Sequence, residues 1–212
     1  MNKKIAIYGG TFSPPHVGHL HAASAFLRQE SPDMLYVIPA NIPPHKKIIS
    51  RDNPQLRLRM TELAFSTLEG YGDSIVVSDF ELRQGGPSYS IYTIEHFAKE
   101  SPNLSMLCGT DMMLSLDTWY RAEDIFRLAD IVYIRREKEV GMTEKLIEKC
   151  RFYREKYNAR IRHIDVEPLV VSSEQLRARL SAGEDCSAFI PEPVLDFIRQ
   201  NNLYGYKRID DR

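Results

Sequence analysis

Short runs of apolar residues alternate along this chain with longer segments in which apolar residues recur at the spacing of a helix. This alternation is typical of strands joined by crossover helices, as in the βαβ units of a parallel sheet. The short runs predict strands at 4–8, 34–38, 74–80, 104–108, 130–134 and 161–166. The longer segments predict helices at 19–29, 54–68, 90–100, 112–116, 121–128, 142–157, 173–182 and 191–201.

The predicted fold is therefore α/β, a doubly wound parallel sheet with helices on both faces. A length of 212 residues without repeats or an interdomain linker predicts one domain, residues 1–212. In such a sheet, ligands bind at the carboxyl ends of the strands, where the strand order reverses. The segments that follow strands, including the long polar loop 39–53, are therefore the places where we expect a binding site.

Composition and charge exclude several classes of function. Hydrophobic residues make up 43% of the chain and charged residues 27%, which is ordinary for a globular enzyme in solution. A net charge of -1 provides no basic field for nucleic acid, and no apolar run has the length of a membrane span or the form of a signal peptide. The three cysteines form no Cys-x-x-Cys pair, which favours reduced thiols over a zinc site. We thus expect a cytoplasmic protein that binds neither nucleic acid nor membranes.

The segment 9–19 reads Gly-Gly-Thr-Phe-Ser-Pro-Pro-His-Val-Gly-His and directly follows a predicted strand. The paired glycines, Gly9 and Gly10, let the main chain approach a bound group without a Cβ in the way. His16 and His19 lie three apart at a predicted helix start, on one face and beside main-chain N–H groups that we expect to be free. With the positive end of the helix dipole, this predicts an anion site suited to phosphate. In isolation, two such histidines are more often polar surface.

Three further segments follow predicted strands. Residues 39–47 read Pro-Ala-Asn-Ile-Pro-Pro-His-Lys-Lys, and the prolines predict an extended loop that presents a histidine and two lysines; a solvated basic loop is the alternative. Residues 81–90 end in Ser-Tyr-Ser before a predicted helix, which Ser88 or Ser90 could cap. The strand 104–108 is followed by Gly-Thr-Asp, whose carboxylate suits the hydroxyls of a ribose.

The remaining candidates are ambiguous when taken alone. Trp119, the only tryptophan, is on composition more often a core residue than a ligand platform. Arg135 and Arg136 are either a solvated pair or part of a phosphate pocket. Residues 171–177 read Val-Ser-Ser-Glu-Gln-Leu-Arg, which predicts a helix start with two capping serines and an arginine one turn further on. Glu174 could serve there as the acid of a capping box.

Together these segments resemble a known family. The string at 9–19 is similar to the first signature of the nucleotidyltransferase superfamily, the Rossmann-like adenylyl- and cytidylyltransferases, and 171–177 resembles the second signature. The Pro-Pro-His-Lys, Ser-Tyr-Ser and Gly-x-Asp…Trp-Tyr segments resemble the bacterial nicotinate-mononucleotide adenylyltransferases. The resemblance extends over nearly the whole chain. Ser13, Ser90 and Glu174 depart from it, since aspartate, threonine and threonine are usual at these positions.

The resemblance implies that ATP and nicotinate mononucleotide are joined to give nicotinate adenine dinucleotide and pyrophosphate, a step of NAD biosynthesis. It implies a helical C-terminal part, about 168–212, that completes the ATP site, and Mg²⁺ that is carried by the ATP phosphates. The acceptor phosphate is largely dianionic at neutral pH, so no general base is expected. Homo-oligomer formation is left open. Two other functions also stay open: a sister transferase acting on another phosphorylated acceptor such as phosphopantetheine, and a non-catalytic nucleotide sensor.

The resemblance also assigns roles to individual residues, and it assigns none as a metal ligand. The catalytic set, which would neutralise phosphate charge, is His16, His19, Lys46 and Arg177. The ATP-binding set is Gly9, Gly10, Thr11, Phe12, Gly18, Gly109, Asp111, Arg136, Ser172 and Ser173. The set for the pyridine mononucleotide, with the indole stacked on the pyridine ring, is Asn41, His45, Ser88, Tyr89, Ser90, Trp119 and Tyr120.

Overall fold

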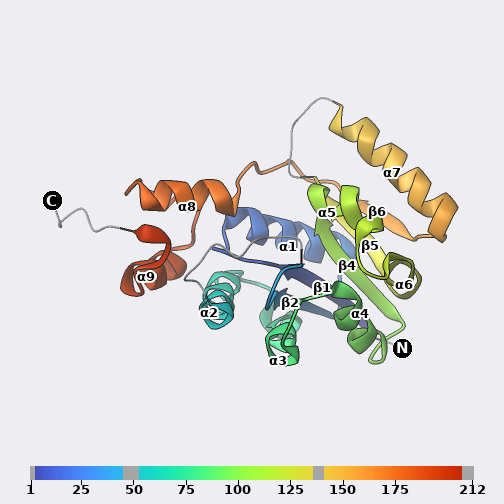
Figure 1. Cartoon of the computed structure of the whole chain (residues 1–212), viewed down its shortest axis with the longest axis horizontal. Helices are drawn as coiled ribbons and strands as arrows, with labels where there is room; N and C mark the ends of the chain where they lie inside the picture. The colour runs from blue at the N-terminus through green and yellow to red at the C-terminus, as the bar shows by residue number, and fades with distance from the viewer. Residues whose placement is uncertain (1–2, 45–52, 136–140, 207–212) are drawn as a thin grey trace.

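The computed structural model describes residues 3–44, 53–135 and 141–206. Its centre is a sheet of six strands, all parallel, in the order β3-β2-β1-β4-β5-β6 (Figure 1). In chain order, the strands are β1 (Lys4–Gly10), β2 (Met34–Pro39), β3 (Ile75–Val77), β4 (Asn103–Gly109), β5 (Asp130–Ile134) and β6 (Ile161–Ile164).

The strand order reverses at β1. From β1 the chain builds outward through β2 to β3, then returns to place β4 on the other side of β1 and continues to β5 and β6. The connections that follow β1 and β4 therefore leave in opposite directions, and a crevice forms between them at the carboxyl ends of the strands. The register sets Gly10 of β1 against Pro39 of β2, so both strands end at the same level.

Helices cover both faces of the sheet because alternate strand residues point to opposite sides. In β1, Ala6 and Tyr8 pack in one core, whereas Ile5 and Ile7 pack in the other. The first core includes buried residues of α1 (Val17–Glu30), α2 (Pro54–Phe65), α8 (Ser173–Ser181) and α9 (Glu192–Gln200). The second core includes those of α4 (Ser90–Ala98), α5 (Thr110–Ser115), α6 (Ala122–Leu128) and α7 (Met142–Tyr157). The predicted doubly wound fold is confirmed.

One predicted element is partly wrong. The strand predicted at 74–80 ends at Val77, and the chain then enters the short helix α3 (Phe80–Gln84). The Ser78 hydroxyl accepts the Phe80 N–H at 3.3 Å, a local bond that favours the helix start over a continued strand. A helix of this length shows no helical period in the sequence. Single-turn 3₁₀ helices occur at η1 (Gly72–Ser74), η2 (Leu116–Thr118) and η3 (Leu203–Gly205).

Other boundaries differ by a few residues, as helix and strand ends commonly do. Helix α1 begins at Val17 rather than at 19, and α5 begins at Thr110 rather than at 112. Helix α2 ends at Phe65 rather than at 68, and β6 ends at Ile164 rather than at 166. These shifts leave the predicted order of elements unchanged.

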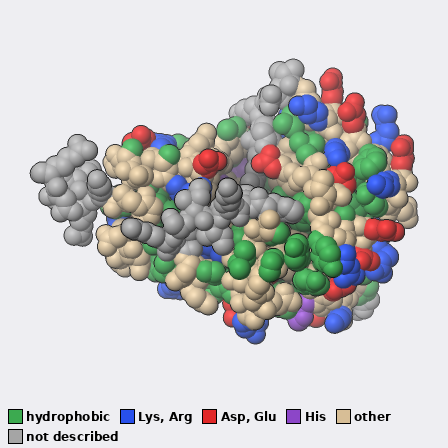
Figure 2. All heavy atoms as spheres, viewed as in Figure 1, with side chains coloured by type: hydrophobic (Ala, Val, Ile, Leu, Met, Phe, Trp, Pro, Cys, Tyr) green, Lys and Arg blue, Asp and Glu red, His purple; other side chains and the backbone are tan. Residues whose placement is uncertain are grey.

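Helices α8 and α9 lie at one end of the long axis, and α7 lies at the other (Figure 1). Acidic and basic side chains are intermixed over the end that carries α7 (Figure 2). Cys108, Cys150 and Cys186 are buried as free thiols. Within the described part of the chain, the helices are all too short or too polar to cross a bilayer.

Candidate active site

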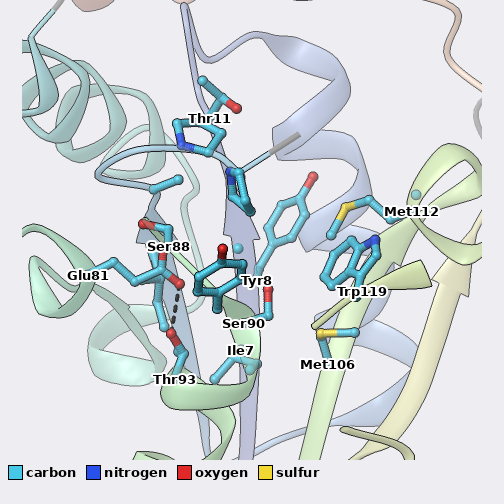
Figure 3. Close-up of a pocket in the computed structure, with 18 of the residues that line it drawn as sticks. Ile7, Tyr8, Thr11, Glu81, Ser88, Ser90, Thr93, Met106, Met112 and Trp119 are labelled. Atoms are coloured by element: carbon cyan, nitrogen blue, oxygen red, sulfur yellow. Dashed lines mark hydrogen bonds between the residues drawn. The ribbon is translucent and has the colours of Figure 1, made fainter. Parts of the chain in front are cut away.

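A cavity of about 420 Å³ opens at the carboxyl ends of β1, β2 and β4, where the strand order reverses. Trp119 and Met112 lie on one side of it, and Glu81, Ser88 and Thr93 lie on the other (Figure 3). Apolar side chains thus face hydroxyl and carboxyl groups across the cavity, and Asp111, Ser115 and Thr118 add further polar groups to its lining. The residues assigned from the sequence that line it are Gly9, Gly10, Thr11, His19, Ser88, Tyr89, Ser90, Gly109, Asp111, Trp119 and Tyr120.

The two glycines that end β1 have different surroundings. A Cβ on Gly9 would meet no atom within 4 Å, so the main chain is open to the cavity there. A Cβ on Gly10 would lie 2.9 Å from the ring of Phe12. That ring is 1% exposed and packs on Tyr8 and His19 at centroid distances of 5.6 and 5.0 Å. The Phe12 side chain thus supports the histidine from the core, which leaves only its main chain for an ATP contact.

His16 and His19 form a capping box at the start of α1. The His16 Nδ1 atom accepts the Gly18 N–H at 3.1 Å, and the His19 Nδ1 atom accepts the His16 N–H at 3.2 Å. Serine and glutamate usually make this reciprocal arrangement. The ring centroids lie 3.8 Å apart, and the residues are only 2% and 7% exposed. The alternative that these histidines are polar surface is therefore wrong.

The capping box also decides which ring nitrogen carries a proton. Because Nδ1 accepts a main-chain N–H in both rings, the donor of each neutral imidazole is Nε2. The main-chain N–H groups here are not free as expected: Val17 donates to the Phe189 carbonyl at 2.9 Å, and Gly18 donates to His16. An anion at this helix start would therefore be bound by the imidazoles and the helix dipole.

The C-terminal helices hold the segment between β1 and α1, residues 11–16, which we call the β1 loop. The Arg177 Nη1 atom donates to the Ser13 carbonyl at 2.7 Å. The Ser173 hydroxyl donates to the Pro14 carbonyl at 3.0 Å. The second sequence motif is thus bound to the main chain of the first, although more than half of the chain separates them.

Gly18 allows the chain before α8 to approach the start of α1. A Cβ on Gly18 would lie 2.7 Å from Val171 Cγ1 and 3.0 Å from the His16 ring. Both distances are shorter than a Cβ tolerates without movement of its neighbours. Glycine at this position is therefore explained by packing beside the imidazoles.

The start of α8 differs from the expectation of two capping serines. Ser172 is the cap, and its hydroxyl accepts the Gln175 N–H at 3.2 Å. Ser173 is the first helical residue, and its hydroxyl points instead to the β1 loop. Glu174 is the second helical residue, whereas the acid of a capping box stands at the third. The interpretation of Glu174 as a capping-box acid is therefore wrong.

The segment after β2, residues 40–44, which we call the β2 loop, is bonded to the segment before α4. The Asn41 N–H donates to the Ser88 hydroxyl at 2.8 Å, and the Asn41 side-chain amide donates to the Gly86 carbonyl at 3.0 Å. In return, the Ser88 N–H donates to the Ile42 carbonyl at 2.8 Å. These bonds hold Ser88, which lines the cavity, against the β2 loop.

The start of α4 does not have the predicted serine cap. Tyr89 occupies the capping position without a side-chain bond, Ser90 is the first helical residue, and the Ser88 hydroxyl is bonded to the β2 loop. Ser90 therefore faces the cavity as its lining without serving as a cap. Tyr120, which is 49% exposed, packs its ring on Tyr89 at a centroid distance of 4.9 Å beside Trp119.

Comparison with known proteins decides the family. The sequence profile of the cytidylyltransferase-like family matches residues 7–182. The chain belongs to the cytidylyltransferase-like family. Two proteins similar to this chain are named probable nicotinate-nucleotide adenylyltransferase. One is from Clostridium botulinum (strain Eklund 17B) and the other from Clostridium tetani. They are 32% and 33% identical to this chain, and the matches cover 95% of it and 98% and 99% of the relatives. The resemblance read from the sequence motifs is confirmed.

Solved structures of lower identity show the same fold. The nicotinic acid mononucleotide adenylyltransferase of Plasmodium falciparum, complexed with NaAD, has a TM-score of 0.77 at 18% identity, covering 97% of this chain and 98% of that chain. A putative nicotinate-nucleotide adenylyltransferase from Vibrio parahaemolyticus has a TM-score of 0.62 at 19% identity, covering 97% of each chain. These matches confirm the Rossmann-like fold.

Two buried charged residues of this cytidylyltransferase-like chain were missed in the sequence. Glu81 is 7% exposed, lines the cavity and accepts the Thr93 hydroxyl at 2.7 Å (Figure 3). Burial raises the pKa of its carboxyl above the usual value, against the opposing effects of Thr93, Ser88 and Arg57. Arg57 is 1% exposed within α2. Glu81 lies in a helix too short to predict, and the apolar pattern of α2 does not distinguish Arg57 from exposed polar neighbours.

Some assigned residues do not line the cavity. His45, Lys46 and Arg136 lie outside the described residues, so their roles rest on the resemblance alone. Arg177 and Ser173 do not line the cavity and bond instead to main-chain carbonyls of the β1 loop. The other described residues that were assigned but lie outside its lining are Phe12, His16, Gly18, Asn41 and Ser172. The assigned residues are thus divided between a cavity wall and a layer that supports it.

Proposed function

We propose that this chain transfers the adenylyl group of ATP to nicotinate mononucleotide, giving nicotinate adenine dinucleotide and pyrophosphate in NAD biosynthesis. The observation that carries the proposal is the composition of a single cavity. One edge of it is the open main chain of Gly9 with His19 beside it, and another is the indole of Trp119. A phosphate-binding edge and a flat aromatic surface are what this pair of substrates requires. The names of the relatives support the same reaction.

Catalysis in this proposal has two sources: the two substrates are aligned, and the negative charge of the ATP phosphates is neutralised. A phosphate monoester has a second pKa of about 6, so the acceptor phosphate is an adequate nucleophile without a general base. The Nε2–H groups of His16 and His19 and the dipole of α1 would stabilise charge on the ATP phosphates as the α-phosphate is attacked and pyrophosphate leaves. Lys46 and Arg177 would add positive charge. No covalent intermediate forms.

The pyridine mononucleotide would bind away from the β1 loop, between Trp119 and the start of α4. The Trp119 indole would stack on the pyridine ring, with Tyr89 and Tyr120 closing the mouth of the cavity. A carboxylate only accepts hydrogen bonds, so a pocket for the acid needs donors. The Ser90 hydroxyl and the main chain of Tyr120 are the groups that we assign to this role. Asn41, Ser88 and His45 complete the acceptor set.

The ATP set combines cavity residues with the supporting layer. Gly9, Gly10 and Thr11 would border the phosphates, Gly18 would let α1 and the chain before α8 pack closely beside them, and Asp111 with Gly109 would bind a ribose. The C-terminal part, about 168–212, would complete the ATP site within a single domain and would contribute Ser172 and Ser173. Arg136, which follows β5, would also bind ATP. The bonds from α8 to the β1 loop support this role.

Mg²⁺ would enter with ATP. It commonly binds through substrate phosphates with few protein ligands, where it lowers the negative charge of the triphosphate. The lining includes the Asp111 carboxylate and a Glu81 carboxyl that is already bonded to Thr93, which fits an ion held mainly by phosphates. A cytoplasmic location and the absence of nucleic-acid and membrane partners stay predictions, and oligomeric state stays open.

The test is pyrophosphate release from Mg²⁺-ATP with a panel of phosphorylated acceptors. We expect release with nicotinate mononucleotide and none with phosphopantetheine or glycerol phosphate. Release with phosphopantetheine alone would assign the chain to a sister transferase. ATP binding without release for any acceptor would favour a nucleotide sensor.

A further inference from the structure

The guanidinium of Arg57 is buried in α2 between two loops. The residue is 1% exposed, although arginine keeps its charge at every ordinary pH. A buried charge is costly unless hydrogen bonds compensate its lost hydration. Nη1 donates to the Thr11 carbonyl and Nη2 donates to the Asn41 carbonyl, each at 2.9 Å. One planar side chain thus contacts the main chains of the β1 loop and the β2 loop.

Arg57 donates its two hydrogen bonds just beyond the point where the main chains of β1 and β2 separate. Pairing of β1 with β2 ends at Gly10 and Pro39, and a last bond runs from the Ala40 N–H to the Gly10 carbonyl at 2.8 Å. Thr11 and Asn41 follow immediately. The guanidinium therefore continues the connection between the strands beyond the end of the sheet, where the cavity begins.

The connection extends to α4. Asn41 is bonded through its N–H to the Ser88 hydroxyl at 2.8 Å. The Glu81 carboxyl interacts with both Ser88 and Arg57. Polar contacts therefore run from the β1 loop through Arg57 and the β2 loop to the start of α4.

We propose that Arg57 is a positioning residue, which holds the β1 loop at a fixed distance from the β2 loop and α4 and thereby aligns the two substrates. This rests on the proposed function, in which the ATP phosphates bind at the β1 loop and the mononucleotide binds at α4. Alignment of two reactants carries much of the rate, and a misplacement of about 1 Å can cost on the order of 100-fold. Arg57 acts through main-chain carbonyls and not on the reacting atoms.

The test compares Arg57→Lys with Arg59→Lys. Lysine keeps the charge but lacks the planar fork that reaches two carbonyls. Arg59 is a matched control on the same helix, because its side chain is 55% exposed and pairs only with Glu62 in the part of the chain that the structure describes. We expect Arg57→Lys to lower kcat at least about tenfold, with both KM values within about threefold of wild type because each loop still binds its own substrate. Arg59→Lys should match wild type.

A second measurement does not depend on activity. Hydrogen exchange should be faster in Arg57→Lys within the β1 loop, the β2 loop and residues 86–90, and unchanged in the strands of the sheet. An unchanged kcat, a loss of activity equal to the loss of folded protein, or a uniform rise in exchange would each overturn the proposal. If wild type and Arg59→Lys release no pyrophosphate, the proposed function is wrong, and the exchange pattern still decides whether Arg57 fixes the loops.

Discussion

The two sides of the cavity hold their functional groups in different ways. On the β1 side, His16 and His19 are nearly inaccessible, each accepts a main-chain N–H, and α8 bonds to the loop between them and the strand. On the other side, Tyr120 is half exposed, and Ser90 faces the cavity at the first turn of α4. The functional groups of the first side are therefore buried and hydrogen-bonded, whereas the second side is more exposed to solvent.

This difference fits the chemistry proposed for each side. Donors that stabilise charge in a transition state are effective when they are fixed before the reaction. Recognition of a flat ring requires mainly an apolar surface and a few donors at its edge. Changes on the β1 side should therefore lower kcat, whereas changes on the Trp119 side should raise the KM of one substrate.

The largest effect is expected for His19→Ala. Loss of one preorganised donor typically lowers the rate roughly 100- to 1,000-fold, and the KM values should change far less. His21→Ala is the control. This histidine also lies in α1, but it does not line the cavity, and its Nε2 atom lies 2.9 Å from the Glu167 carbonyl oxygen, to which it is hydrogen-bonded. Steady-state kinetics and thermal unfolding of both variants decide the point. A normal rate with a lowered Tm for His19→Ala would give the ring a purely structural role.

Trp119→Ala should raise the KM for nicotinate mononucleotide. Stacking of a base on an aromatic side chain is worth about 1–3 kcal/mol, so the rise should be on the order of tenfold or more. The KM for ATP should stay close to the wild-type value. Trp119→Phe keeps a ring and should recover most of the affinity. Equal increases in both KM values would contradict the separation of the two sides.

Gly18→Ala should have a smaller effect, on both folding and rate. The new Cβ would lie 2.7 Å from Val171 Cγ1 and 3.0 Å from the His16 ring. Overpacking of this kind costs about 1–3 kcal/mol of unfolding free energy, and displacement of the imidazole should lower kcat. Val171→Ala in the same chain should restore much of both losses. Strictly additive effects in this double-mutant cycle would show that the contact is unimportant.

The smallest expected effect concerns pH. Burial holds the pKa of the Glu81 carboxyl above 4.5 in the folded chain. The folded state therefore favours the protonated acid, so this contribution to stability is complete below pH 4.5 and is lost as pH rises through the folded pKa. Glutamine does not titrate. The unfolding free energy of Glu81→Gln relative to wild type should thus increase as the pH rises from below 4.5, as measured by urea unfolding. A difference that is independent of pH would contradict the assigned cause.

Much of this arrangement follows from patterns that a sequence displays. Buried parallel strands appear as apolar runs, and the motif at 9–19 places two histidines at a helix start because its spacing suits one helix face. The spacing could not reveal that both imidazoles satisfy the main chain there, since that depends on ring orientation. The expectation of free N–H groups failed for this reason.

Residues that act through tertiary contacts were the ones missed. Arg57 has the same sequence environment as its exposed neighbour Arg59, and only the fold brings it between Thr11 and Asn41. Glu81 is buried because a five-residue helix turns it toward Thr93. Arg57 does not stand out in the helical pattern of α2, and α3 is too short to show a period, so sequence periodicity contains no information on the burial of either residue.

The most direct test of the account is a competition between two mononucleotides. The purified chain is given Mg²⁺-ATP with equal concentrations of nicotinate and nicotinamide mononucleotide, and both dinucleotides and pyrophosphate are quantified. The product ratio equals the ratio of the two kcat/KM values. Because a site with donors for a carboxylate leaves them unpaired with the amide, we predict mainly nicotinate adenine dinucleotide, with one pyrophosphate for each dinucleotide formed. Formation of NAD in equal or greater amount would contradict the preference for the acid, and the absence of any dinucleotide would contradict the proposed reaction itself.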